Sequence, residues 1–389
     1  MKALKKILSA LPALAILCIL VVPAAAPAED GVISGQQGGG SGSAYGEGIK
    51  GGTTTFQKHL ILPAEANVPN ATFSFTIVSG RSAEATATTL EITAGPEGAE
   101  VGTATFTPTS ETKTGIPTDT SISGKKYASA TVTVSLTKVS FPAPGVYRYV
   151  ISENVTGLDA AFSTDEVPQY LDVYVANSAA ASATNHLEIK GYVLHSDESA
   201  PLNTGGEPAI KSDGFTNEYA AQNLTFSKTV TGNQGSRDKY FKFTVSITGA
   251  AAGAKYDVDL TNADAAVPES VSTKSEYIGK SNAASIEIPA GATGTEAVYY
   301  LKNGQSLTIK GLAKGTGYTI TEEYEDYTQT VEGTANGTIG TEDITVAYTN
   351  NRGGAVPTGV MLTIVPGVII VGIAIVGLIV FSRKKKENE

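Results

Sequence analysis

Ala130-Thr131-Val132-Thr133-Val134-Ser135-Leu136 alternates hydroxyl side chains with apolar ones, and the same period of two recurs in Thr72–Ile77 and in Tyr170–Val175. Because successive side chains of a β-strand point to opposite faces, this alternation indicates strands with one buried and one solvated face. Many such short runs follow one another from residue 53 onward, separated by Gly, Pro, Asn and Asp. The sequence therefore predicts an all-β fold of β-sandwiches, with no long amphipathic helix.

The strand-rich region is duplicated. Four short motifs return in the same order, and the distance from the repeated Lys to the repeated Glu differs by one position between the copies. The distance from that Glu to the repeated Asn is much longer in the first copy, which indicates an excursion there. The duplication predicts two tandem domains, residues 53–219 and 223–350, joined by residues 220–222. The motif pairs are TFQK (55–58) and TFSK (225–228), FSF (73–75) and FKF (241–243), YVISE (149–153) and YTITE (318–322), and FTN (215–217) and YTN (348–350).

Three polar residues of each copy share a strand face with large apolar residues. Residues two apart on a strand point the same way, so each polar side chain faces inward wherever its apolar neighbour does. The adjacent alternatives Glu323 and Asn351 fall on the opposite face. Taken singly, each of these polar residues is also compatible with an ordinary solvated strand position. The six residues are Lys58, Glu153 and Asn217 in the first copy and Lys228, Glu322 and Asn350 in the second.

Such a buried set predicts a chemical reaction between its members. An unpaired ammonium or carboxylate is costly to bury, typically several kcal/mol per ion. Desolvation lowers the pKa of a Lys and raises that of a Glu, which favours a neutral amine beside a protonated carboxyl. The amine can then attack the Asn side-chain carbonyl while the Glu polarises that carbonyl and transfers protons until ammonia leaves. The expected product is a Lys–Asn isopeptide bond in each domain.

The N-terminus has the features of an export signal. Three lysines precede an apolar run from Ile7 to Val22, and small residues follow up to Ala28. This order predicts a secretory signal peptide over residues 1–28. Residues 29–52 are rich in Gly and Ser and nearly devoid of apolar residues, which predicts a flexible leader.

The C-terminus, residues 351–389, has the features of a membrane anchor. Val356-Pro357-Thr358-Gly359 stands directly before Val360–Phe381, an apolar run without charge. A helix needs roughly 20 such residues to cross a bilayer, so this run is long enough. The basic cluster Arg383–Lys386 behind it is expected on the cytoplasmic side.

Charge and residue types exclude several classes of function. The formal net charge is −10, and part of the basic charge lies in the two terminal segments, which argues against a nucleic-acid partner. Cys18, the single cysteine, lies in the signal peptide, so the exported part has no disulfide. His59, His186 and His195 lack metal-ligand spacing, and no phosphate-binding glycine loop precedes a helix, so we expect neither a metal nor a cofactor.

The repeated motifs resemble those of a known domain family. A Lys near the first strand, Tyr-x-Ile-x-Glu late in the domain and aromatic-Thr-Asn on the last strand are similar to the Cna protein B-type, reverse-immunoglobulin domains of Gram-positive pilins. The resemblance implies two tandem immunoglobulin-like β-sandwiches, each closed by an isopeptide bond. The implied bonds join Lys58 to Asn217, catalysed by Glu153, and Lys228 to Asn350, catalysed by Glu322.

Residues 351–389 resemble the cell-wall sorting signal of Gram-positive surface proteins. Their motif departs from the common Leu-Pro-x-Thr-Gly form, and Val356-Pro357-Thr358-Gly359 is similar to the signal of streptococcal T-antigen-type shaft pilins. In that family a pilin-specific sortase, a cysteine transpeptidase, cleaves between Thr and Gly. The resemblance therefore implies cleavage after Thr358, which becomes the acyl donor.

Shaft assembly also needs an acceptor amine. The resemblance points to Lys211, six positions before Asn217, and Lys190 is the rival. An unbroken strand would turn Lys211 inward, so we expect a break at Ser212-Asp213-Gly214 to release it. The Tyr-Pro-Lys-Asn motif of other shaft pilins is absent, so both lysines remain candidates.

The function predicted from the sequence is structural: the major subunit of a sortase-assembled pilus on a Gram-positive cell wall, anchored transiently in the membrane before sorting. The implied partners are the pilin sortase, other copies of the chain, tip and basal pilins, peptidoglycan and a possible host receptor. The alternative is a monomeric wall-anchored adhesin that binds a host or environmental ligand. Neither hypothesis makes the chain an enzyme beyond forming its own bonds once.

Overall fold

A computed structural model describes residues 48–156, 158–178, 187–199, 201, 211–269 and 273–354. Within these residues the regular secondary structure is β-strand apart from the single 3-10 turn η1 (Ser275–Tyr277), so the all-β prediction is confirmed. No helix in the described part is long and apolar enough to span a membrane. The predicted signal peptide, most of the predicted leader and the predicted membrane span lie outside it.

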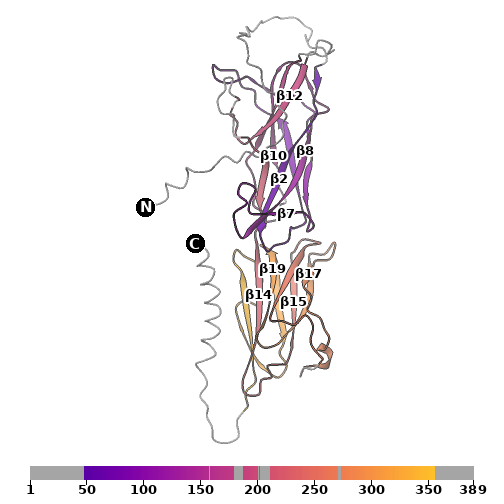
Figure 1. Ribbon diagram of the computed structural model, residues 1–389, viewed down its shortest axis with the longest axis vertical. Coiled ribbons are helices and arrows are strands. Elements are labelled where there is room, and N and C mark those ends of the chain that lie inside the picture. Colours follow the sequence, from indigo (N-terminus) through magenta and orange to yellow (C-terminus); the bar gives the residue numbers. More distant parts are fainter. Residues whose placement is uncertain are drawn as a thin grey trace, which may run out of the picture. The chain divides into compact units, whose positions relative to one another are not determined.

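The described strands form two separate sets of sheets, and none of these sheets combines strands from before and after residue 220 (Figure 1). In the first set, one sheet has the order β12-β11-β10-β3-β6 with β4 on β10, the other has the order β13-β2-β8-β5 with β7 on β8, and β1 pairs with β9. The strands are β1 (Ile49–Lys50), β2 (Thr53–Pro63), β3 (Ala71–Ser79), β4 (Ile92–Ala94), β5 (Glu100–Val101), β6 (Thr103–Phe106), β7 (Thr112–Thr114), β8 (Lys125–Ser135), β9 (Ser140–Phe141), β10 (Gly145–Glu153), β11 (Gln169–Asn177), β12 (Leu187–His195) and β13 (Gly214–Glu218).

The second set repeats this plan with fewer residues. One sheet has the order β17-β16-β19-β14-β23-β21 and the other β18-β15-β20-β22. The strands are β14 (Ala221–Thr231), β15 (Phe241–Thr248), β16 (Lys255–Thr261), β17 (Ser285–Glu287), β18 (Gly294–Leu301), β19 (Gln305–Ala313), β20 (Gly317–Glu323), β21 (Thr328–Glu332), β22 (Asn336–Thr338) and β23 (Ile344–Asn351).

The residues that form the two cores are those that the alternating sequence pattern predicts to be buried. In β8, Val132 and Val134 are buried while Thr131 and Thr133 are exposed. The aromatic residues of the repeated motifs meet between the sheets: the Phe75 ring lies 5.1 Å from those of both Phe56 and Phe215. In the second set the Phe243 ring lies 5.2 Å from those of Phe226 and Tyr348. Aromatic pairs at such distances add to the apolar burial that holds two sheets together.

The first long strand and the last strand of each set lie side by side and run parallel. β13 pairs in parallel with β2, and β23 with β14, so Lys58 lies opposite Phe215 and Lys228 opposite Tyr348. In a parallel pair, the residue two positions further along the partner strand lies on the same face. This register brings Asn217 next to Lys58 and Asn350 next to Lys228.

Two expected boundaries differ from the structure. The predicted flexible leader was too long, because Ile49–Lys50 pairs with Ser140–Phe141 and the Ile49 side chain packs against the first core. Apolar burial therefore orders the end of the leader. The predicted joint was also too long, since β14 already begins at Ala221.

The excursion expected in the first copy contains β11 and β12, which extend the sheet beyond β10. The chain then crosses from the β12 edge to the other sheet. Lys211 forms an isolated antiparallel bridge with His195, and β13 begins only at Gly214 beside β2. The expected interruption between Lys211 and the last strand is present, and Lys211 is exposed.

Gly214 is required at this crossing. Its φ is +142°, and a Cβ there would lie 1.8 Å from the Gln57 carbonyl oxygen.

We expect Gly214→Ala to destabilise the first domain by about 2 kcal/mol or more, because backbone strain of roughly 1–3 kcal/mol adds to the steric overlap with Gln57. Chemical denaturation measures the change. Gly102→Ala is the matched control, since its nearest new contact would be an ordinary 3.5 Å; equal stabilities of the two variants would contradict the prediction.

Candidate functional site: two buried Lys–Glu–Asn triads

The first triad joins three strands of the first sandwich. Lys58 lies on β2, Asn217 on the neighbouring β13 and Glu153 at the end of β10 in the facing sheet. The exposed fractions of the three residues are 0%, 0% and 7%. All three are thus removed from water, on the same inner face as the core aromatic residues.

The three side chains form a closed ring of polar contacts. Lys58 Nζ donates to Glu153 Oε2 at 2.5 Å and also to Asn217 Oδ1, and Asn217 Nδ2 donates to Glu153 Oε1 at 2.8 Å. The Lys58 ammonium also lies 4.7 Å from the centre of the Phe73 ring. The carboxyl therefore touches both the amine and the amide nitrogen, the two groups between which a proton must move if ammonia is to leave.

The second triad repeats this placement. Lys228 lies on β14, Asn350 on β23 and Glu322 on β20 in the facing sheet. Lys228 Nζ lies 2.6 Å from Glu322 Oε1, and Asn350 Nδ2 donates to the same oxygen at 2.9 Å. Asn350 Oδ1 is buried and accepts no hydrogen bond from the described residues.

Burial lowers the pKa of both lysine amines. Removal from water is the largest influence on Lys58 and Lys228, and the neighbouring Glu only partly offsets it. The pKa of Lys228 falls to about 8. Because only the neutral amine is a nucleophile, this direction favours attack on the Asn carbonyl.

The surroundings of the two triads differ. Asn217 Nδ2 also donates to the Ser163 carbonyl oxygen at 2.6 Å, and the Thr216 amide donates to Asp165 Oδ2 at 2.9 Å. In the second domain Gln329 on β21 lies directly opposite Asn350 and donates through Nε2 to Glu322 Oε2 at 2.7 Å. The sequence alone does not indicate Ser163, Asp165 or Gln329, because only the strand register and the fold of the excursion bring them to the triads.

The other predicted site residues fall in different places. Val356, Pro357, Thr358 and Gly359 lie outside the described residues. Lys190 is exposed on β12 and ion-paired with Glu188. Lys211 is exposed at the crossing into β13 and has no ion pair with the described residues.

Among the described residues, which include His59 and His195 but not His186, no group of three or more His, Cys, Asp or Glu side chains could hold a metal ion. His59 instead contacts Ser129 Oγ at 2.8 Å and Asp213 Oδ2 at 3.0 Å. His195 belongs to a buried cluster with Arg148 and Asp172.

Comparisons with known proteins agree with this architecture. Residues 222–352 match a family model described as a domain of unknown function, DUF7601. A protein named Pilin from Streptococcus pyogenes serotype M1 is 25% identical over 274 residues, which cover 66% of this chain and 72% of the relative.

Among solved structures, the major pilin from Streptococcus pyogenes matches with a TM-score of 0.51 and 21% identity, over 79% of this chain and 100% of that one. The major pilin T3.2 of the same species matches with a TM-score of 0.46 and 20% identity, over 78% of this chain and 100% of that one. The chain is thus similar in sequence to a streptococcal pilin, and the first structural match shows a shared fold.

Gln329 is expected to hold the Glu322 carboxyl in its reactive orientation. Gln329→Leu removes a hydrogen bond to a charged group, so bond formation in the second domain should slow about tenfold. Intact mass recorded at intervals after synthesis measures this as delayed loss of ammonia. Gln57→Leu is the matched control, because Gln57 donates to Thr131 Oγ1 away from the triad. Equal rates in the two variants would remove Gln329 from the reaction.

Proposed function

We propose that this chain is the shaft subunit of a covalently polymerised pilus on a Gram-positive cell wall, with one self-formed isopeptide bond in each sandwich. The observation that carries the proposal is the pair of buried triads, placed alike in two tandem β-sandwiches. The similarity to a streptococcal pilin supports the same role. The proposed domains are residues 53–219 and 223–350.

The proposed bond formation is an amide exchange within the folded chain. Lys58 Nζ attacks Asn217 Cγ, the new C–N bond forms, and Asn217 Nδ2 leaves as ammonia. Glu153 accepts a proton from the amine and delivers one to the leaving nitrogen, and its contacts with both nitrogens support this role. Lys228, Asn350 and Glu322 act in the same way in the second domain.

Such bonds suit a subunit that carries tension. The first long strand and the last strand of each domain are neighbours, so a bond between them transmits force along the chain without loading the rest of the sandwich. Cross-linking distant residues also restricts the unfolded chain; a disulfide closing a loop of comparable length contributes roughly 4–5 kcal/mol in the chain-entropy model. An isopeptide bond does this without cysteine and resists reductants.

Export and assembly complete the proposed function. Residues 1–28 direct secretion, and residues 351–389 retain the chain in the membrane until a pilin sortase cleaves after Thr358. The Thr358 acyl group of each copy is then transferred to a lysine amine of another copy, and that of the last copy to an amine of peptidoglycan. Tip and basal pilins are the remaining proposed partners.

Wall extracts test this function directly. Boiled extracts of the native host should show a ladder of high-mass species that react with antibody to the chain, because the subunits are covalently joined. Thr358→Ala should abolish the ladder while the monomer persists. A single wall-linked band in the unaltered strain would contradict a shaft role and favour the monomeric adhesin.

A further inference from the structure

A second buried polar cluster lies on the outer face of the sheet that contains β10, whereas Glu153 of the triad lies on its inner face. Tyr147 and Tyr149 of β10 point into the core, so Arg148 between them points to the outer face. There it meets Asp172 of β11 and His195 at the end of β12. Although this face is the outer one, Arg148, Asp172 and His195 are only 1%, 1% and 2% exposed.

The three side chains are fully engaged with one another. Arg148 donates through Nε to Asp172 Oδ1 at 2.7 Å and through Nη2 to Asp172 Oδ2 at 2.8 Å, and His195 Nε2 lies 3.0 Å from the same Oδ2. Burial opposes the charge of Asp172, yet the hydrogen bonds from Arg148 and His195 outweigh it and hold the pKa of the carboxyl below its ordinary value. A buried ion pair is weak evidence for stability, because apolar residues can fill the same space at less cost. The cluster therefore calls for another role.

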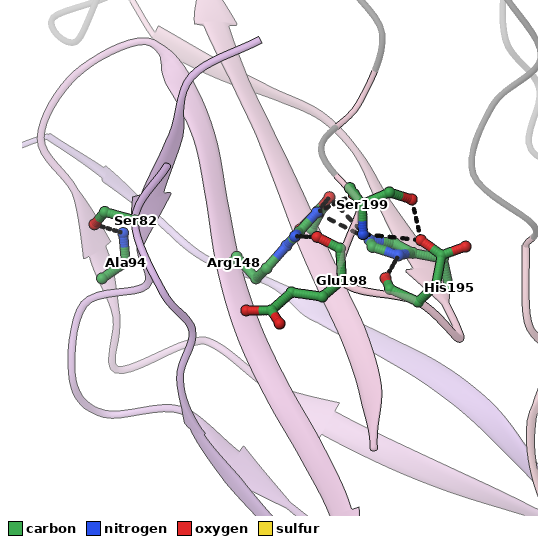
Figure 2. A network of polar contacts seen from close by, with 8 residues as sticks. Ser82, Ala94, Arg148, His195, Glu198 and Ser199 are labelled. Atoms are coloured by element: carbon green, nitrogen blue, oxygen red, sulfur yellow. Dashed lines mark hydrogen bonds and ion pairs between the residues drawn. The ribbon is translucent and has the colours of Figure 1, made fainter. Parts of the chain in front are cut away.

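The cluster organises the backbone that follows β12. Arg148 donates to the carbonyl oxygens of Glu198 at 2.8 Å and Ser199 at 3.1 Å, and His195 Nδ1 lies 2.6 Å from the carbonyl oxygen of Asp197 (Figure 2). Figure 2 shows the guanidinium aimed between His195 and these carbonyl groups. Three consecutive residues after β12 are thereby fixed on the side chains of β10 and β12.

The end of β12 in turn holds Lys211. His195 and Lys211 form an antiparallel bridge, and the Ser212 amide donates to the Leu194 carbonyl oxygen at 2.9 Å. On the other side, Asp213 Oδ2 lies 3.0 Å from His59 Nε2. Paired residues of antiparallel strands point to the same side, so Lys211 lies on the outer face with His195.

The corner formed by residues 194–199 and 211–213 distinguishes the two candidate acceptor lysines. Lys190 must first leave its ion pair with Glu188, whereas Lys211 is exposed and has no carboxylate partner within the described residues. The backbone of Lys211 is nevertheless fixed from two sides. A free amine on a fixed backbone approaches an acyl donor at a lower entropic cost than one on a loose segment.

Resting on the proposed shaft function, we infer that the Arg148–Asp172–His195 cluster positions Lys211 as the amine that joins one subunit to the next. The neutral Lys211 amine attacks the thioester formed between the Thr358 carboxyl of another copy and the sortase cysteine. The C–N bond forms, the C–S bond breaks, and the amine proton returns with the released thiol. The cluster touches neither reacting atom and acts only by fixing the backbone at residues 194–199 and 211–212.

The test uses the full chain in its native host, with substitutions at the chromosomal locus. His195→Phe retains the ring that stacks on Tyr170 but loses the polar contacts with Arg148, Asp172 and Asp197. Peptide mass mapping of purified pili should show Thr358–Lys211 cross-links reduced about tenfold or more relative to the unaltered strain. Tyr192→Phe on the same strand is the matched control, because its hydroxyl contacts Gly52 rather than the cluster.

If the cluster only stabilised the fold, further variants would give different results for Lys211 coupling and for the mass of the first domain. His195→Asn restores a donor near the position of Nδ1 and should recover part of the Lys211 coupling, while the mass of the first domain should show its internal bond in every variant. If the His195→Phe variant fails to form that internal bond, the Arg148→Lys variant is used instead. In either variant, hydrogen exchange at the Ser212 amide reports whether the corner has loosened. A loosened corner with lowered coupling supports the inference.

Three results overturn the inference or its premise, and they can be told apart. Unchanged Lys211 coupling in His195→Phe or Arg148→Lys with a loosened corner would show that the cluster does not position the acceptor. Cross-links that map to Lys190 or another lysine in the unaltered strain would remove Lys211 while leaving the shaft function intact. Absence of any Thr358 cross-link between copies would overturn the shaft function itself.

Discussion

The whole structure depends on removing an ammonium, a carboxyl and a carboxamide from water at one point between two sheets. Such groups are costly to bury unless each finds a partner, and each triad supplies the partners in a closed or nearly closed ring. The same burial lowers the pKa of the amine and makes it a nucleophile. The burial of these polar groups, which costs free energy, is thus also the condition for the proposed isopeptide bond formation.

The parallel pairing of terminal strands decides which residues can be joined. In each domain the Lys belongs to the first long strand and the Asn to the last, and their register makes them diagonal neighbours on one face. The proposed bond at this point closes the sandwich by linking these two strands. The excursion in the first domain adds β11 and β12 without disturbing this pair, and it provides the corner that carries Lys211.

Much of the fold and the triads could be predicted from sequence because both follow from a period of two. Lys58 and Asn217 lie two positions from core aromatic residues, so the face of the strand follows from local sequence alone. Arg148 shows the limit of this reasoning: it alternates with core residues and has the pattern of a solvated position, yet it is buried. Its cover comes from residues 197–199, which are distant in sequence and placed by the fold. Gln329 was missed for the same reason, since only the β21–β23 register brings it to Glu322.

The intact mass of the exported chain tests the central claim most directly. The account predicts a mass lower than that of the sequence by two molecules of ammonia, one for each domain, and a deficit of one ammonia when Glu153 is replaced by Ala. A mass equal to that of the unmodified sequence would contradict it, because the buried lysines and asparagines would then lie in contact without reacting.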